Sequence, residues 1–264
     1  MVHAEIEESN HHLREFWKLY AQVSLGGEVF DQDGLSIANA KQPWFFMNVA
    51  MLNRPSINQA DLKRRTQEAQ EHFRGGKHPW VLTASEDWFG FNSESILTSI
   101  GLVHKLELMG MLAERLSPPT RRLPDVQLRW ISDEETRFAL ADLNADAYSV
   151  PKEWGRQALG SAALWRAPLF GRIAYVGGEP ASGAFTLPID NALYVGWVAT
   201  SKAHRSLGLA ELVIRTSLKD ARKATGLERT ILHATSEGQP VYTRMGYRPI
   251  VKFPFYGPDE RNRA

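Results

Sequence analysis

The stretch RSLGLA, residues 205–210, lies between a strand-like segment and a long amphipathic helix. The first N–H groups of a helix have no intrahelical acceptor and carry a partial positive charge, so they bind anions that can approach them. Gly208 permits this approach because it has no side chain, and Ala210 keeps the next position small. Arg205 adds a fixed cation. We therefore predict that the backbone amides from Arg205 to Ala210 hold a phosphate group.

Two common phosphate-binding patterns do not occur at this loop. A P-loop requires a glycine-lysine-serine or glycine-lysine-threonine ending, and a dinucleotide fold requires three glycines in the first turn of a parallel unit. The three strand-like segments before the helix, 171–177, 181–188 and 192–200, instead predict an antiparallel meander. The helix itself is expected to carry an ion pair between Glu211 and Arg215 and to end at Gly226.

A second stretch with chemical potential is GQPVYTRMGYRPIV, residues 238–251. Pro240 suits the first turn of a short helix and Gly246 its end, so Tyr242 and Met245 fall on one helical face. By composition alone, Tyr242 is a core tyrosine whose hydroxyl is hydrogen-bonded. The surrounding sequence favours a functional role, for the reason given next.

Both stretches resemble the signatures of the GNAT acetyltransferase superfamily. RSLGLA fits the pattern arginine-or-glutamine, x, x, glycine, x, glycine-or-alanine, and YTRMGY resembles the second signature, a tyrosine four residues before a glycine-aromatic pair. They occur in the family's order and separation, and the resemblance covers about residues 125–256. It implies an α/β (α+β) fold, with a mixed and mostly antiparallel sheet flanked by helices.

The resemblance also implies a set of binding residues for acetyl-coenzyme A. The edge of the central strand, at Trp197, Val198 and Ala199, would pair with the pantetheine arm and align the thioester carbonyl with amides that stabilise an oxyanion. Tyr242 would assist departure of the thiolate. The pyrophosphate would be held by the backbone amides of Arg205, Ser206, Leu207, Gly208, Leu209 and Ala210.

The resemblance leaves the general base open. An alkylamine has a reference pKa of about 10.4, so freeing it at neutral pH costs about 4 to 5 kcal/mol and calls for a base or a water chain. Many relatives carry a carboxylate on the central strand, but ALYVGWVAT, residues 192–200, has none. Asp190 and Glu237 are the nearby candidates, and each also fits a solvated loop carboxylate.

Composition limits the partners. The 264 residues include 31 basic and 30 acidic side chains, a formal net charge of +1, and this near-neutral balance disfavours a nucleic-acid binder. No cysteine is present, which excludes disulfides, thiolate nucleophiles and cysteine metal ligands. No signal-peptide pattern and no run of eighteen apolar residues occurs, so we expect a cytoplasmic protein with no membrane partner. No metal site is expected.

The chain is predicted to form two domains. RLSPPTRRLP, residues 115–124, holds three prolines and three arginines and suits an interdomain linker. The segments on either side follow a similar order: Gly101 lies 145 residues before Gly246, and the strand end at Leu52 lies 148 residues before that at Thr200. These offsets suggest a duplication. We expect a degenerate GNAT-like domain at 1–124 and a catalytic GNAT domain at 125–264.

The first half has no counterpart of the phosphate loop. At the matching junction it reads NRPSINQADL, residues 53–62, with a proline and no glycine. In the second half, a helix over residues 132–148 is expected to begin with Ser132 as its cap and Glu135 as the capping-box partner.

The hypothesis is an N-acetyltransferase that passes an acetyl group from acetyl-coenzyme A to a primary amine within a ternary complex. A small-molecule acceptor is expected, and a protein amine is possible. The alternative is a non-catalytic acyl-coenzyme A sensor that keeps the cofactor loop without turnover. The sequence does not identify the amine acceptor, the preferred acyl-chain length or the oligomeric state.

Overall fold

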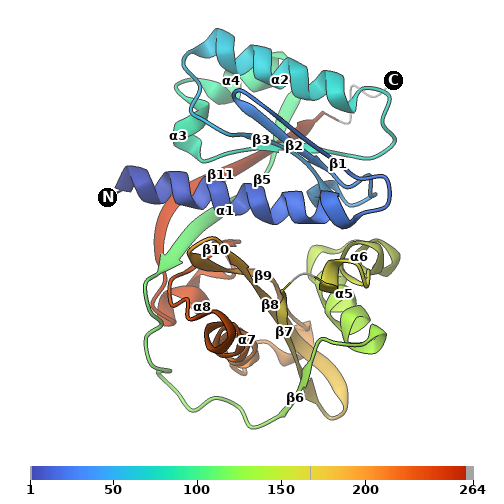
Figure 1. Ribbon diagram of the computed structural model, residues 1–264, viewed down its shortest axis with the longest axis vertical. Coiled ribbons are helices and arrows are strands. Elements are labelled where there is room, and N and C mark those ends of the chain that lie inside the picture. The colour runs from blue at the N-terminus through green and yellow to red at the C-terminus, as the bar shows by residue number, and fades with distance from the viewer. Residues whose placement is uncertain (1, 167, 260–264) are drawn as a thin grey trace. The chain divides into compact units, whose positions relative to one another are not determined.

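The computed structural model describes residues 2–166 and 168–259 (Figure 1). By internal contacts the chain divides into two compact units, the first comprising 1–110 with 250–264 and the second 111–249. The C-terminal segment therefore belongs to the first unit. The expected domains 1–124 and 125–264 stay a prediction about which segments fold on their own. Across the residues that the structure describes, no helix combines the length and hydropathy of a transmembrane span.

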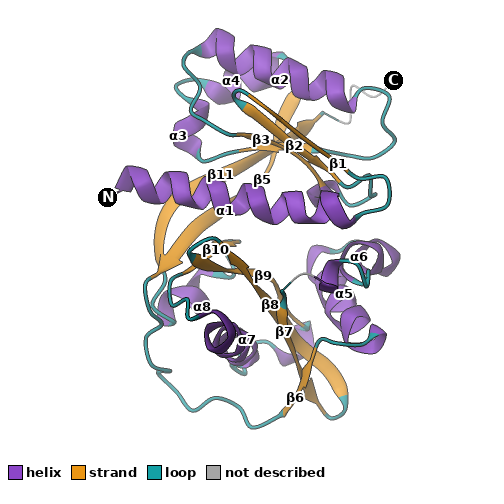
Figure 2. Ribbon diagram, in the orientation of Figure 1, coloured by secondary structure: helices purple, strands orange, loops and turns teal. Residues whose placement is uncertain are grey.

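The first unit is a sheet with helices on both faces (Figures 1 and 2). Helix α1 buries Leu13, Phe16 and Tyr20 against strands β1 to β3, and α2 lies on the other face. Its elements are α1 (Val2–Val23), β1 (Glu28–Gln32), β2 (Leu35–Asn39), a 3-10 turn (Phe45–Met47), β3 (Asn48–Leu52), α2 (Gln59–Phe73), β4 (Val81–Thr83), α3 (Glu86–Phe89) and α4 (Ser93–Ser99). Strand β1 was not expected, because all but one of its residues are exposed and it carries no buried apolar face.

The second unit has the antiparallel meander that the sequence predicts. Strands β7, β8 and β9 pair antiparallel in sequence order, and Figure 1 shows α7 on one face of them and α5 with α6 on the other. Its elements are β6 (Gln127–Trp130), α5 (Glu134–Tyr148), α6 (Lys152–Leu159), a 3-10 turn (Leu164–Arg166), β7 (Phe170–Val176), β8 (Glu179–Ile189), β9 (Ala192–Thr200), a 3-10 turn (Lys202–His204), α7 (Leu209–Thr225), β10 (Thr230–Ala234) and α8 (Gln239–Arg244).

The two halves share one order of elements. In each, three antiparallel strands lead into a long helix, then into a strand parallel to the third, β4 beside β3 and β10 beside β9, and then into a short helix. Gly101 and Gly246 follow the short helices with φ of 84° and 99°, directly before β5 (Leu102–Ala113) and β11 (Arg248–Pro258). Gly101 and Gly246, which are 145 residues apart, thus lie in equivalent turns of the two halves.

The final strand of each half is exchanged. The end of β5 belongs to the second unit, where it neighbours β10. Most of β11 belongs to the first unit, where it pairs antiparallel with β4 through Phe255 opposite Thr83. Strand order is therefore β1-β2-β3-β4-β11-β5 in the first unit and, starting from the end of β5, β5-β10-β9-β8-β7-β6 in the second. Mostly antiparallel strands flanked by helices form the α/β fold that the sequence predicts.

The cap of α5 differs from the expected one by a single position. Asp133, not Ser132, is the N-cap, and its carboxylate accepts from Thr136 N at 2.8 Å. The Thr136 hydroxyl completes the capping box by accepting from Asp133 N. Glu135 forms an ion pair with Arg129 instead. A carboxylate one residue later replaces the hydroxyl because it is an equally good cap and adds charge at the helix N-terminus.

Candidate active site

The loop before α7 has the backbone geometry of an anion site. Gly208 is the N-cap with φ of 86°, and no side chain caps the helix. The first intrahelical bond runs from Leu212 N to Gly208 O, so the amides of Leu209 to Glu211 have no intrahelical acceptor. Arg205, Ser206 and Leu207 are exposed, and Ser206 also adopts a positive φ, 63°. Arg205, Ser206 and Leu207 thus form an exposed turn, Gly208 is the N-cap, and Leu209 and Ala210 begin the helix with bare amides.

The base of this loop is rigid. Glu211 is buried in the first turn of α7, and its carboxylate accepts from Arg215 Nε at 2.7 Å, as the i, i+4 spacing predicts. Arg215 thus neutralises the Glu211 carboxylate, which lies in the same helical turn as the bare amides. Gly226 ends the helix with φ of 74°, and its N–H bonds to Arg222 O.

Strand β9 separates from β10 after its third residue, Tyr194. Their parallel register joins Leu193 to Thr230 and Tyr194 to Ile231, whereas β9 continues to Thr200. Beyond Tyr194, and within the described residues, the pairing of β9 with β10 ends. An unpaired strand edge presents N–H and C=O groups to a further extended chain.

A β-bulge lies on the separated part of β9. Gly196 and Ala199 face Phe185 and Gly183 on β8, so Trp197 and Val198 together oppose Ala184 alone, and Trp197 has a φ of 49°. The Trp197 carbonyl accepts from Asn144 Nδ2 of α5 at 3.1 Å. A bulge re-aims backbone groups, and this one lies at Trp197 and Val198, two of the three positions predicted for the pantetheine arm.

Tyr242 lies on the short helix α8 and exposes 8% of its surface. Burial raises the pKa of its phenol well above the usual value, and the nearby phenols of Tyr148 and Tyr247 add to the shift. Burial, with the Glu237 charge, raises the pKa of Tyr148 to about 12, although 37% of that residue remains exposed. The Tyr148 ring meets the Trp197 ring edge-on at 6.1 Å between centroids. Tyr148 thus contacts the bulge and acts electrostatically on Tyr242.

The two candidate bases occupy different positions. Asp190 is exposed in the turn before β9, at the end of that strand away from the bulge, about 20 Å along an extended chain from Trp197. Glu237 is exposed in the loop before α8 and acts electrostatically on Tyr148. A further titratable pair was not identified from the sequence. The hydroxyl of Tyr194 on β9 lies 2.9 Å from Nδ1 of His233 on β10. Of the two carboxylates, Glu237 is closer to the tyrosine cluster.

A family model matches the part of the chain that contains these features. Residues 128–247 match the model of the acetyltransferase (GNAT) family, and this range includes the loop, the bulge and the tyrosine helix. The chain contains a GNAT domain. The expected resemblance is therefore confirmed for the second half.

Solved structures extend the likeness of fold to the whole chain. A GCN5-related N-acetyltransferase from Kribbella flavida is 16% identical, covers 95% of both chains and superposes with a TM-score of 0.71. A functionally unknown conserved protein from Staphylococcus epidermidis is 13% identical, with 87% of this chain and 93% of that chain covered and a TM-score of 0.65. A tandem GNAT protein from the clavulanic acid biosynthesis pathway is 14% identical, with coverages of 84% and 77% and a TM-score of 0.52. Comparison with curated protein sequences finds no match.

The matching loop of the first half differs from that of the GNAT domain. Helix α2 is capped by Asn58, whose side chain accepts from Asp61 N at 2.9 Å, and Asp61 accepts from Ile57 N at 3.1 Å. Asp61 also forms ion pairs with Arg65 and Arg54. In the first half, the amide of Asp61 in the first helical turn and the amide of Ile57 before the helix thus have side-chain acceptors from the chain itself. Leu97, 145 residues before Tyr242, is a buried apolar residue on α4.

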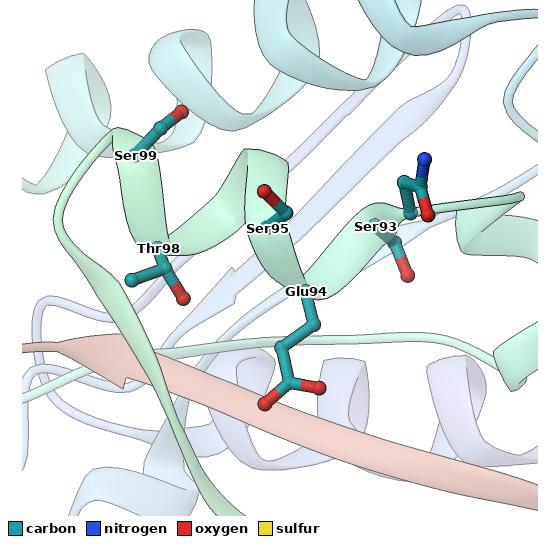
Figure 3. A pocket seen from close by; sticks show the side chains of 6 residues that line it. Ser93, Glu94, Ser95, Thr98 and Ser99 are labelled. Atoms are coloured by element: carbon teal, nitrogen blue, oxygen red, sulfur yellow. The ribbon is translucent and has the colours of Figure 1, made fainter.

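A pocket in the first unit lies on this same short helix. It has a volume of about 760 Å³, and Figure 3 shows its lining side chains along α4. The lining residues are Asn92, Ser93, Glu94, Ser95, Thr98 and Ser99. None of the predicted site residues lines it. Elsewhere, within residues 2–166 and 168–259, no three His, Asp or Glu side chains converge as a metal-binding group.

Proposed function

We propose that the protein is an acetyl-coenzyme A-dependent N-acetyltransferase of the cytoplasm that acetylates a primary amine by direct attack in a ternary complex. The observation that carries the proposal is the N-terminus of α7 after Gly208, which no side chain caps, together with the edge of β9 that is not paired with β10. A diphosphate needs several N–H donors and positive charge, and the loop at 205–210 offers both.

The proposed binding mode uses the separated strand as well as the loop. The edge of β9 at Trp197, Val198 and Ala199 would hydrogen-bond to the amide groups of the pantetheine arm, as an added strand does. The bulge turns backbone groups of this edge out of the regular ladder. An amide N–H aimed at the thioester oxygen would stabilise the negative charge that develops there when the amine attacks.

In the proposed transfer, the amine lone pair forms the C–N bond, the C–S bond breaks, and coenzyme A leaves as a thiolate. Tyr242 would donate a hydrogen bond to the sulfur. Its raised pKa makes complete proton transfer to the thiolate unfavourable, because the thiol that would form has a reference pKa of only about 8.5, so the phenol keeps its proton. The proton released by the amine goes to a base or a water chain, for which Glu237, which acts on Tyr148, and the hydrogen-bonded pair of Tyr194 and His233 are the candidates.

The test is an assay of free thiol release from acetyl-coenzyme A with a panel of a polyamine, an aminoglycoside, free amino acids and peptides with free N-termini. We expect one class of amine to accelerate thiol release. Tyr242→Phe should lower kcat on the order of a hundredfold and leave the affinity for acetyl-coenzyme A nearly unchanged. Tyr247→Phe is the matched control, because that buried phenol bonds to Thr230 within the same cluster.

A non-catalytic acyl-coenzyme A sensor is the second candidate. Its supporting observation is that no residue of β9 is a carboxylate, so the base seen in many relatives is missing. The sensor would bind acetyl-coenzyme A as tightly as the wild-type enzyme and release no thiol with any amine. Under that outcome, Tyr242→Phe would have no turnover to change.

A further inference from the structure

The segment between β5 and β6 is docked on the second unit along its length. Figure 2 shows it as a continuous loop with neither helix nor strand. Glu114, at its start, forms an ion pair with Arg229. Ser117 N donates to Met245 O at 2.8 Å, and Ser117 O accepts from Arg215 at 2.8 Å. The arginine- and proline-rich sequence predicted a linker, and the contacts show that this linker has a fixed path.

The linker meets both signature glycines. A Cβ on Gly246 would lie 2.6 Å from Ser117 Oγ, and a Cβ on Gly208 would lie 3.2 Å from the guanidinium of Arg121. Arg121 also donates from Nη1 to the Ser206 carbonyl at 3.3 Å. Residues 117 and 121 therefore contact the end of the tyrosine helix and the phosphate loop, respectively.

The charge around Arg121 is unbalanced. Its guanidinium lies beside the positive end of α7, and Arg205 adds a third positive group on the same exposed turn. Within the described part of the chain, no carboxylate forms an ion pair with Arg121, and Glu211 is already paired with Arg215. Positive groups placed together in this way repel each other unless an anion lies among them.

We propose that Arg121 of the linker binds the diphosphate of the acyl-coenzyme A. A guanidinium bonds to phosphate oxygens through two parallel N–H groups, and its hydrogen bond to Ser206 O fixes it at the loop whose amides face the same anion. Arg215 connects the first turn of α7 to Ser117, and Ser117 connects to the end of α8. The linker thereby joins the diphosphate loop to the helix of Tyr242.

This inference rests on the proposed function, and one binding experiment separates the two. Calorimetry measures the Kd of coenzyme A for the wild type, Arg121→Ala and Arg122→Ala. Arg122 is the matched control, an adjacent exposed arginine in the same loop. We expect Arg121→Ala to weaken binding about tenfold and Arg122→Ala to change it less than twofold. Thermal melts should be alike for all three, because both arginines are exposed.

Three ligands locate the contact. The loss caused by Arg121→Ala should persist with dephospho-coenzyme A, which keeps the diphosphate, and vanish with acetyl-pantetheine, which lacks it. A loss that disappears with dephospho-coenzyme A would assign Arg121 to the ribose phosphate and overturn the proposal. Equal Kd values for Arg121→Ala and the wild type, or tighter binding by the variant, would overturn it as well. If the wild type binds no coenzyme A ligand, the proposed function fails first.

Discussion

Asn144 on α5 donates from Nδ2 to two carbonyls at once, that of Leu140 on its own helix at 2.9 Å and that of Trp197 in the β9 bulge at 3.1 Å. Asn144 is completely buried. The side chain therefore fastens the bulge to the helix behind it. A backbone turn that is held in this way keeps one orientation, as preorganised donors require.

Asn144→Ala is expected to destabilise the fold and to slow transfer. The Trp197 carbonyl would lose a buried donor, at a cost of about 1 to 3 kcal/mol in the free energy of unfolding. Ser182→Ala is the control. The Ser182 hydroxyl on β8 donates to the carbonyl of Ala199, which lies on β9 like Trp197 but outside the bulge. Urea denaturation should show similar losses for both, with kcat falling at least tenfold further in Asn144→Ala. Equal kcat values in the two variants would contradict the role of the bulge.

Gly208 and Gly226 provide a matched pair at the two ends of α7. Both have positive φ, 86° and 74°, so alanine at either position costs about 1 to 2 kcal/mol of backbone strain. Open space surrounds the Cβ position of Gly226, whereas that of Gly208 faces Arg121 in the phosphate loop. We expect Gly208→Ala to weaken coenzyme A binding at least tenfold and Gly226→Ala to leave the Kd unchanged at similar stability. Calorimetry and urea denaturation measure both quantities.

Gly246→Ala should destabilise the protein more than Gly101→Ala. Both glycines have positive φ before equivalent strands, so the two alanine variants carry similar backbone strain. An added Cβ meets nothing within 4 Å at Gly101 but meets Ser117 Oγ at 2.6 Å and Ser117 N at 2.9 Å at Gly246. Overpacking of this kind adds about 1 to 3 kcal/mol. Equal unfolding free energies for the two variants would show that the linker is not docked at Gly246.

The buried tyrosines predict a loss of stability at alkaline pH. Burial raises the pKa of Tyr242 above the reference value of about 10, so the unfolded chain releases that proton first as pH rises. The stabilisation that the protonated Tyr242 phenol adds to the folded state is complete below about pH 10. It is lost as the pH rises further, by up to about 1.4 kcal/mol of unfolding free energy per pH unit for one group. Tyr242→Phe should reduce the slope of unfolding free energy against pH between 10 and 11. An unchanged slope would contradict burial of the phenol.

Local features of the site could be predicted from the sequence. The loop at 205–210 and the helix of Tyr242 depend on glycine, proline and helix-end preferences within a few residues, and Gly208 and Gly246 adopt the positive φ that these features require. The offsets between Gly101 and Gly246 also correspond to equivalent turns, because a duplicated order of elements keeps its spacing.

Contacts between distant residues could not be predicted. The bond from Asn144 to Trp197 spans 53 residues, and that from Arg121 to Ser206 spans 85. Neither side chain differs in type from ordinary polar surface residues. The exchange of β5 and β11 leaves no mark in the sequence, because each strand has the same pattern whichever sheet it joins.

In the proposed function, the bare amides between Arg205 and Ala210 bind the diphosphate of a coenzyme A thioester. Calorimetric titration of the full chain with acetyl-coenzyme A tests it most directly. In the first half, the side chains of Asp61 and Asn58 accept hydrogen bonds from amides of the matching loop, so we predict one molecule bound per chain. In Gly208→Ala, the binding should be lost or weakened at least tenfold. The absence of binding heat at every concentration tried, or equal affinity in wild type and Gly208→Ala, would contradict the claim.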